Sequence, residues 1–162
     1  MLGDMIFLGI DPGVSGGIAA LRSVQEPAFC RLDLDKVTER DIADFLTDAA
    51  PHHWGCVIER VGPCRGDAQR RQGASSMFTF GKGYGFLRGL LIALEIRFVE
   101  VAPSKWPAEF GLRREKNESA TVTKNRNKAK AQQLYPTVDV PHWKADALLL
   151  ATYCQRRAKE LF

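Results

Sequence analysis

The sequence has no apolar run long enough to cross a membrane, because a spanning helix needs about 20 consecutive apolar residues. Its four cysteines lie far apart without a C-x-x-C pair, which argues against zinc and is typical of free thiols in a reducing cytoplasm. The first apolar run begins about five residues after Met1, which leaves no room for a signal or transit peptide. We therefore expect a cytoplasmic protein with no membrane partner.

Internal repeats, low-complexity segments and linker-like stretches are also missing. The chain has 162 residues, of which 45% are hydrophobic and 26% charged, and this composition is globular. That length suits one well-packed domain and is too short for two ordinary ones. We expect residues 1–162 to form a single domain.

Acidic residues are scarce in the later part of the chain. Residues 62–162 carry nine acids against eighteen bases, whereas residues 1–61 carry ten acids against five bases. Segment 105–130 alone has eight Lys/Arg against three Glu. Such an asymmetry fits a polyanionic partner such as nucleic acid, and it fits a solvated basic face equally well.

The segment Met5–Arg22 combines two apolar runs with an acid and a glycine-rich turn. Residues 6–10 predict a buried strand that ends at Asp11, and residues 18–21 predict the strand that returns after the turn. A buried carboxylate needs a charged or hydrogen-bonding partner. Asp11 is therefore either a cap of the Pro12-Gly13 turn or one member of a functional site.

The remaining pattern predicts a mixed sheet with helices on both faces, because three closely spaced strands precede strands that alternate with helices. Glycines recur every fourth residue in one expected helix, which favours close packing there by a sheet, a partner helix or a nucleic-acid backbone. The expected elements are strands at Ala28–Leu34, Gly55–Val61 and Arg97–Val101; helices from Thr38 to Pro51, Met77 to Ile96, Ser104 to Gly111, Thr123 (as N-cap) to Tyr135, and Lys144 to Lys159; and a mobile loop over residues 113–122.

Two more acids and a histidine fit either structural or functional roles. Glu59 ends an apolar strand, where its structural explanation is an ion pair with Arg60 or Arg97. Asp146 lies near the start of the last helix, where the helix dipole favours acids. His142 precedes it and is by itself an ordinary loop residue. Together with Asp11, these residues are an oxygen-rich set that suits hard divalent cations, and two such ions would support phosphodiester hydrolysis.

Five segments resemble the RuvC-type Holliday-junction resolvases, especially the short phage and organellar branch, from about Ile6 to Tyr153. They are GIDPGVSGGIA, VIERV, FGKGYGFLRGLLIAL, VAPSKW and HWKADALLLATY, starting at residues 9, 57, 80, 101 and 142. The first alone also occurs in actin-like ATPases and other nucleases, whereas the ordered set is specific. The resemblance implies a ribonuclease H-like α/β fold: a five-stranded mixed sheet flanked by helices on both faces.

By the same resemblance, Asp11, Glu59 and Asp146 are catalytic and bind two metal ions, Mg²⁺ with Mn²⁺ as an alternative. The family carries one more ligand shortly before the last Asp. His142 matches it four residues ahead of Asp146, whereas Trp143, three ahead, cannot ligate; Asp139 is the alternative. Lys105 and Lys124 match in position the family's lysines that hold the scissile phosphate or support catalysis, and Lys105 is the one expected to be catalytic. The implied DNA-binding residues are Arg65, Arg70, Arg71, Phe78, Phe80, Lys82, Lys105, Arg113, Arg114, Lys124 and Lys128.

The resemblance implies a homodimer that resolves four-way DNA junctions by paired symmetric nicks, in recombination, repair or phage DNA processing, without an organic cofactor. The helix Met77–Ile96 is the expected dimer face. The alternatives are a nuclease of the same fold acting on branched DNA or RNA generally, a catalytically inactive DNA-binding module, and an ATP-binding protein, for which the chain lacks a second lobe.

Overall fold

A computed structural model describes residues 5–23, 25–62 and 73–162 and confirms the expected five-stranded mixed sheet. The order across the sheet is β3-β2-β1-β4-β5. β1, β2 and β3 pair antiparallel, whereas β1, β4 and β5 pair parallel, so β1 lies at the centre. The strands are β1 Ile6–Asp11, β2 Gly17–Arg22, β3 Ala28–Arg31, β4 His53–Glu59 and β5 Phe98–Val101.

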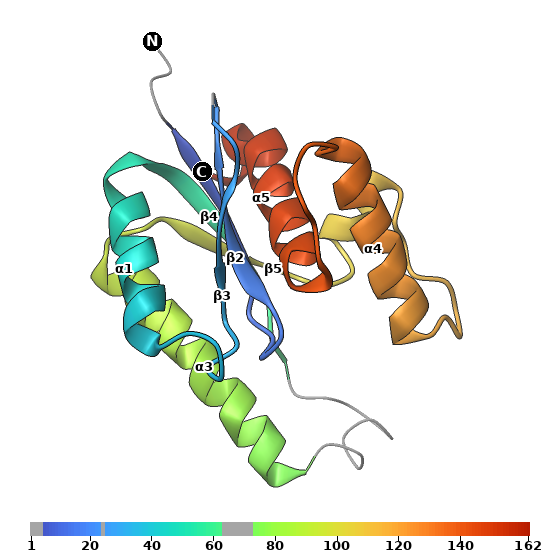
Figure 1. The fold of residues 1–162 in the computed structure, drawn as a ribbon, viewed down its shortest axis with the longest axis horizontal. Coiled ribbons are helices and arrows are strands. Elements are labelled where there is room, and N and C mark those ends of the chain that lie inside the picture. Colours follow the sequence, from blue (N-terminus) through green and yellow to red (C-terminus); the bar gives the residue numbers. More distant parts are fainter. Residues whose placement is uncertain (1–4, 24, 63–72) are drawn as a thin grey trace.

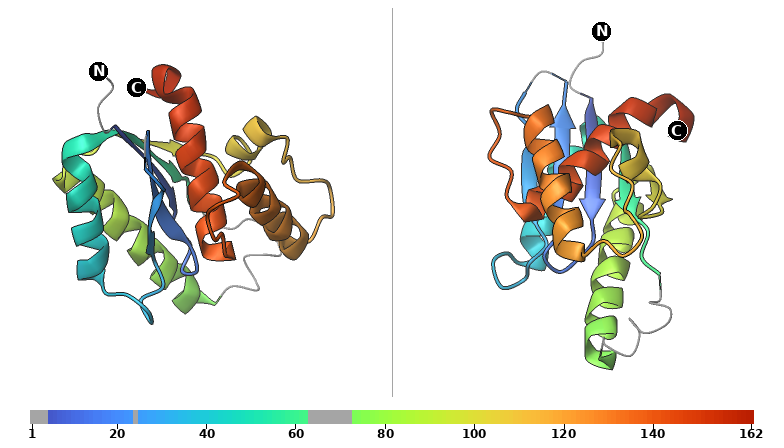
Figure 2. Two further views of the ribbon diagram at one scale, coloured as in Figure 1. Left: turned by 45° about the horizontal axis from the view of Figure 1, so that its top comes forward. Right: turned by 90° about the vertical axis from the view of Figure 1, so that its right-hand side faces the viewer.

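Helices cover both faces of this sheet (Figure 1). On one face lie α1 and α3, and on the other lies α5, with α4 packed against its outer side. The first turns of α3 extend beyond the end of the sheet (Figure 2). None of the helices in the described ranges is long and apolar enough to span a membrane. The helices are α1 Glu39–Ala49, α3 Ala74–Ala93, α4 Ala120–Leu134 and α5 His142–Leu161, with 3-10 turns η1 Ala50–His52 and η2 Trp106–Phe110.

Alternation along β1 builds a core on each face. Ile6, Leu8 and Ile10 are buried toward α1 and α3, while Phe7 is buried toward α5. Gly9 also faces α5, and a Cβ at this position would collide with the backbone of Ala147 and Ala151. The last helix therefore lies directly on the central strand. This close contact explains why α5 carries alanines where it crosses β1.

Gly9→Ala is expected to lower the free energy of unfolding by about 3 kcal/mol, because the added methyl group meets backbone atoms that have no rotamer to change. Urea denaturation measures the change. Gly62→Ala is the control, since a Cβ there meets none of the described atoms within 4 Å and should change stability by less than about 0.5 kcal/mol. Equal stability of the two variants would contradict this packing.

Several expected boundaries were wrong. Ser119, not Thr123, caps α4, because its side chain accepts a hydrogen bond from the backbone of Val122. Residues 120–122 are therefore helical, and β3 ends at Arg31, three residues earlier than expected. The face of α3 that carries Gly81, Gly85 and Gly89 does not pack on the sheet, because Cβ atoms at these glycines would meet nothing within 4 Å in the described structure. The helix contacts the core through Leu87 and Leu91 instead.

Candidate active site

Three carboxylates come together where β1 and β4 end and α5 begins, at the lower edge of the sheet in Figure 1. Asp11 is the last residue of β1, and Glu59 is the last residue of β4. These neighbouring strands are parallel, so their carboxyl ends lie at the same edge. Asp146 joins them from the second turn of α5, which crosses β1.

Burial raises the pKa of all three carboxyl groups. The pKa of Glu59 rises from 4.5 to about 7, and the charges of Asp11 and Asp146 add to the effect of burial while a hydrogen bond from Trp106 opposes it. The pKa of Asp146 rises from 3.8 to about 6 through burial and the charge of Asp11. Burial also raises the pKa of Asp11. Carboxyl groups perturbed in this way are typical of functional sites.

Asp11 caps the turn at Pro12 and Gly13, which was the first of its two expected roles, and it also lies near the other two acids. Its Oδ1 accepts a hydrogen bond from the backbone of Gly13 at 3.2 Å. Gly16 folds back onto it, since a Cβ there would lie 2.9 Å from the Asp11 Cγ and closer still to its carbonyl oxygen. A side chain at position 16 would therefore collide with Asp11, so the turn can pack this closely on the carboxylate only with glycine there.

Glu59 is held by an aromatic donor and not by an ion pair. Its Oε2 accepts a hydrogen bond from the indole Nε1 of Trp106 at 2.6 Å. Within the described ranges it forms no salt bridge with Arg60 or Arg97. The structural explanation offered by the sequence is therefore wrong, and Trp106 is a site residue that sequence reasoning missed.

Asn127 on α4 is the second missed residue. It is 4% exposed, and its Nδ2 donates a hydrogen bond to Oδ1 of Asp146 at 2.9 Å. Its own Oδ1 is buried and meets no hydrogen-bond partner among the described atoms. The sequence signal is a polar residue one helical turn before the buried Ala131, but nothing in the sequence pairs it with Asp146.

Asp146 lies between two cavities. The smaller cavity, of about 240 Å³, is also lined by Asp11, Lys124 and His142. The larger cavity, of about 450 Å³, is also lined by Glu59, Asn127 and two arginines. Among the described residues, the linings are Asp11, Ser15, Arg31, Asp33, Lys124, His142, Trp143 and Asp146 for the first, and Glu59, Pro103, Ser104, Trp106, Pro107, Leu112, Arg113, Arg114, Thr123, Asn127 and Asp146 for the second.

The structure brings His142 to the carboxylates but leaves Asp139 outside. His142 is the first residue of α5 and lines the cavity that contains Asp11 and Asp146. Asp139 is exposed and lines neither cavity. Trp143 has a packing role, because its ring contacts the guanidinium of Arg31 at 5.1 Å from the ring centroid.

Lys124 is the lysine that reaches the site. It lines the smaller cavity. Its positive charge partly offsets the rise that burial causes in the pKa of Asp11 and of Asp146. Lys105 is exposed just before η2 and lines neither cavity, and the half-buried Lys128 also lies outside both linings.

The oxygen-rich donor set fits a hard divalent cation, because buried acids with raised pKa values need positive charge before all can ionise. As the side chains stand, no three His, Cys, Asp or Glu side chains in the described ranges are gathered closely enough to hold a metal ion. Glu59 and Asp146 instead each have one oxygen bonded to a protein donor.

Two arginines reach the larger cavity from a loop that is tied down, not from the mobile loop that was expected. Arg113 and Arg114 line that cavity. Arg126 on α4 donates to the backbone oxygens of residues 112 and 113 and binds Glu118 through two nitrogens at 3.0 and 3.1 Å. The Glu118 side chain is only 8% exposed, so this ion pair is a partly buried clamp.

Glu118→Gln is expected to loosen residues 112–119 without unfolding the domain, because it removes one charge of the clamp. Hydrogen exchange of these amides should quicken about tenfold, with a loss of about 1–2 kcal/mol in global stability. Glu115→Gln is the matched control, since its carboxylate is exposed in the same loop. Equal exchange in the two variants would contradict the clamp.

The N-terminal part of α3, with Phe78 and Phe80, lies near the turn that follows Asp11, and its residues line neither of the two cavities at Asp146. Phe78 is 75% exposed, Phe80 is half-buried and Lys82 is exposed, and all three line a third cavity, described below. Arg65, Arg70 and Arg71 lie outside the described residues.

In sequence, the chain matches no described protein family and no curated protein. Solved structures that match it include two whose alignments cover 96% of this chain and 96% of theirs, each with 12% sequence identity. They are Thermus thermophilus RuvC, with a TM-score of 0.55, and T. thermophilus RuvC in complex with a Holliday junction substrate, with a TM-score of 0.58. The fold is therefore the RuvC type of the ribonuclease H-like fold, as the sequence resemblance implied.

Proposed function

We propose that the protein is a divalent-metal-dependent DNA endonuclease that cuts four-way junctions by paired symmetric nicks. The observation that carries this proposal is the cluster of Asp11, Glu59 and Asp146 at one sheet edge, with raised pKa values and Lys124 beside it. The RuvC fold supports a nuclease, and the junction in one neighbouring structure supports branched DNA as the substrate class.

The three carboxylates and His142 would hold two Mg²⁺ or Mn²⁺ ions. Bound cations would supply Lewis-acid activation of water and stabilise the leaving 3′-oxygen. The position of His142 in the same cavity as two of the acids supports it over Asp139. Lys124, from α4, would bind the scissile phosphate or support catalysis; it reaches the acids more directly than Lys105. Asn127 would fix the orientation of Asp146.

DNA would approach across the basic loop and the aromatic end of α3. Arg113 and Arg114 line the cavity that contains Glu59, and their charges suit phosphates on either side of the cut. Phe78 and Phe80 would stack on opened bases. A homodimer would place two sites on a two-fold junction, and the open glycine face of α3 is the surface proposed for it.

Cleavage of an immobile four-way junction with Mg²⁺ tests this function, with mapping of both cut positions. We expect nicks placed symmetrically across the branch. Labelled flaps, simple duplexes and RNA–DNA hybrids are run beside it. Equal cutting of simple duplex would contradict a junction resolvase, preference for RNA would favour the broader nuclease, and junction binding without any metal-dependent cutting would indicate an inactive module.

A further inference from the structure

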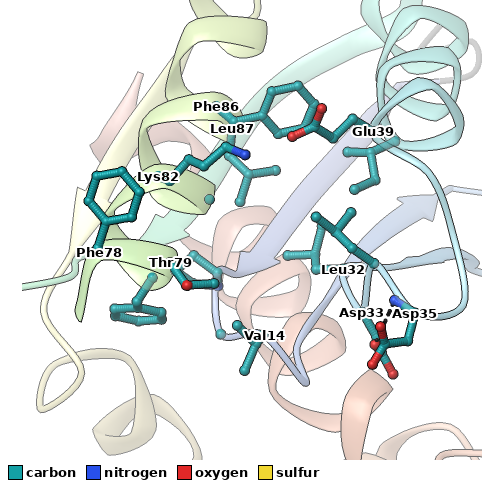
Figure 3. Close-up of a pocket in the computed structure, with 16 residues that line it drawn as sticks. Val14, Leu32, Asp33, Asp35, Glu39, Phe78, Thr79, Lys82, Phe86 and Leu87 are labelled. Atoms are coloured by element: carbon teal, nitrogen blue, oxygen red, sulfur yellow. Dashed lines mark hydrogen bonds between the residues drawn. The ribbon is translucent and has the colours of Figure 1, made fainter. Parts of the chain in front are cut away.

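A third cavity, here called the outer cavity, adjoins the Asp11 turn and has a volume of about 380 Å³. It lies between that turn, the loop from β3 to α1, and the first half of α3 (Figure 3). Its floor includes the buried Leu32 and Leu87, and Phe78, Phe80 and Phe86 contribute aromatic surface from α3. Its size is at the lower end of the range for small-ligand sites.

Exposed apolar side chains gather at this cavity. Val14, Leu34 and Phe78 are 60%, 57% and 75% exposed, and all three line it. The only other exposed large apolar side chains in the described structure are Ile92 and Val122, and neither lines the cavity. An exposed apolar patch of this kind marks a binding surface.

Carboxylates face the aromatic wall. Asp33, Asp35 and Glu39 line the outer cavity from the β3–α1 loop and the start of α1, on the side away from Phe78 in Figure 3. These groups accept hydrogen bonds and repel phosphates, so the cavity suits a flat apolar group that carries N–H donors. Among the described residues that line the outer cavity, Lys82 is the only basic one.

The outer cavity is continuous with the carboxylate cluster along the chain and in space. Pro12 and Gly13, which directly follow Asp11, form part of its wall. Asp33 lines both the outer cavity and the cavity of Asp11, Lys124 and His142. The two cavities therefore share a wall at Asp33, and the outer cavity lies beside the carboxylate cluster.

We propose that the outer cavity binds one unpaired nucleobase with an exocyclic amino group, from the DNA strand that is cut. This inference rests on the proposed function and adds base selection to it. The base stacks on Phe78 or Phe80 and donates its amino hydrogens to Asp35 or Glu39. Adenine, cytosine and guanine each carry an exocyclic amino group that can donate to these acceptors, whereas thymine has only its ring N3–H, flanked by two carbonyl oxygens that the carboxylates repel. An apolar peptide with a basic residue is the competing occupant, disfavoured because the cavity adjoins the catalytic turn.

The first test compares cleavage of four-way junctions that carry each base at each position around the cut. At one position, wild-type protein should cut thymine junctions about tenfold more slowly than the others. Asp35→Asn/Glu39→Gln should reduce this preference to about twofold or less. Asp44→Asn/Asp48→Asn removes two acids of α1 outside the cavity and should retain it. No preference in the wild type, or equal preference in both double variants, would overturn the proposal.

The second test separates the cavity from the cleavage reaction. The fluorescent base 2-aminopurine is placed at each position of a junction bound to Asp11→Asn protein, and release of one base from the duplex stack should change its signal at a single position. Adding Thr79→Trp, which fills the cavity from an exposed helix position, should abolish that change; Ser76→Trp, outside the lining, should not. If the wild type cuts junctions but no base is released, the proposed role of the outer cavity is wrong and the nuclease stands. If a base is released but the wild type does not cut, the proposed nuclease activity is wrong and the cavity stands. If there is no cutting and no base release, both proposals are wrong.

Discussion

Asp11→Asn and Glu59→Gln should each slow junction cleavage by about a thousandfold while leaving junction affinity within about threefold. Each substitution keeps the shape of the side chain and removes a negative charge from the cluster formed by β1, β4 and α5. The phosphate-binding groups on the basic loop and α4 remain in place. Single-turnover cleavage measures the rate, and gel-shift or anisotropy titration without divalent cations measures affinity.

Asp48→Asn is the matched control, because it removes one exposed acid from α1. We expect its rate to equal that of the wild type. Cleavage at the wild-type rate by either cluster variant would contradict the mechanism. An equal loss of binding and cleavage would show that the acids are structural, which circular dichroism and thermal unfolding of each variant would then corroborate.

Without divalent cations, the protein should be less stable at pH 8 than at pH 5, by about 2–3 kcal/mol. The pKa of Glu59 is about 7 in the folded chain and 4.5 for the free side chain, so the folded state binds a proton that the unfolded state releases. One pKa unit corresponds to about 1.4 kcal/mol. This stability is complete below pH 4.5 and is lost as the pH rises through about 7. Asp146 adds the same trend up to about pH 6.

Urea denaturation across this range in EDTA measures the effect, and Glu59→Gln should remove most of the pH dependence. Mg²⁺ should restore stability at pH 8 more than at pH 5, since the ionised cluster attracts cations and the protonated cluster does not. A wild-type stability that is flat with pH, or one that rises toward pH 8, would contradict the buried position of this acid.

Much of the site could be predicted from the sequence because strands deliver their last residue to a sheet edge. Asp11 and Glu59 each end an apolar run, and the parallel pairing of those strands brings the two acids together. The sheet itself followed from the spacing of apolar runs. The capping box at Thr38 also marked the start of α1 correctly.

What escaped prediction depends on how helices rotate and where they dock. Asn127 and Asp146 are nineteen residues apart, and only the packing of α4 against α5 pairs them. The sequence offered both Lys124 and Lys105 as active-site lysines, and the same packing places Lys124 in the lining of the smaller cavity and leaves Lys105 outside both cavities. Ser119 and Thr123 are both acceptable caps, and the clamp between Glu118 and Arg126 favours the earlier one by ordering the residues that precede it.

Asp146 directly precedes Ala147 in α5, and the backbone of Ala147 lies against Gly9 of β1. The contact between α5 and β1 therefore fixes the position of Asp146. We therefore expect the candidate catalytic acid to belong to the slowest-exchanging unit of the protein, without a local opening of its own. Inactivation by heat should then coincide with global unfolding. Inserting one residue into α5 after His142 would rotate His142 by about 100° relative to Asp146 and silence the site while the core stays intact.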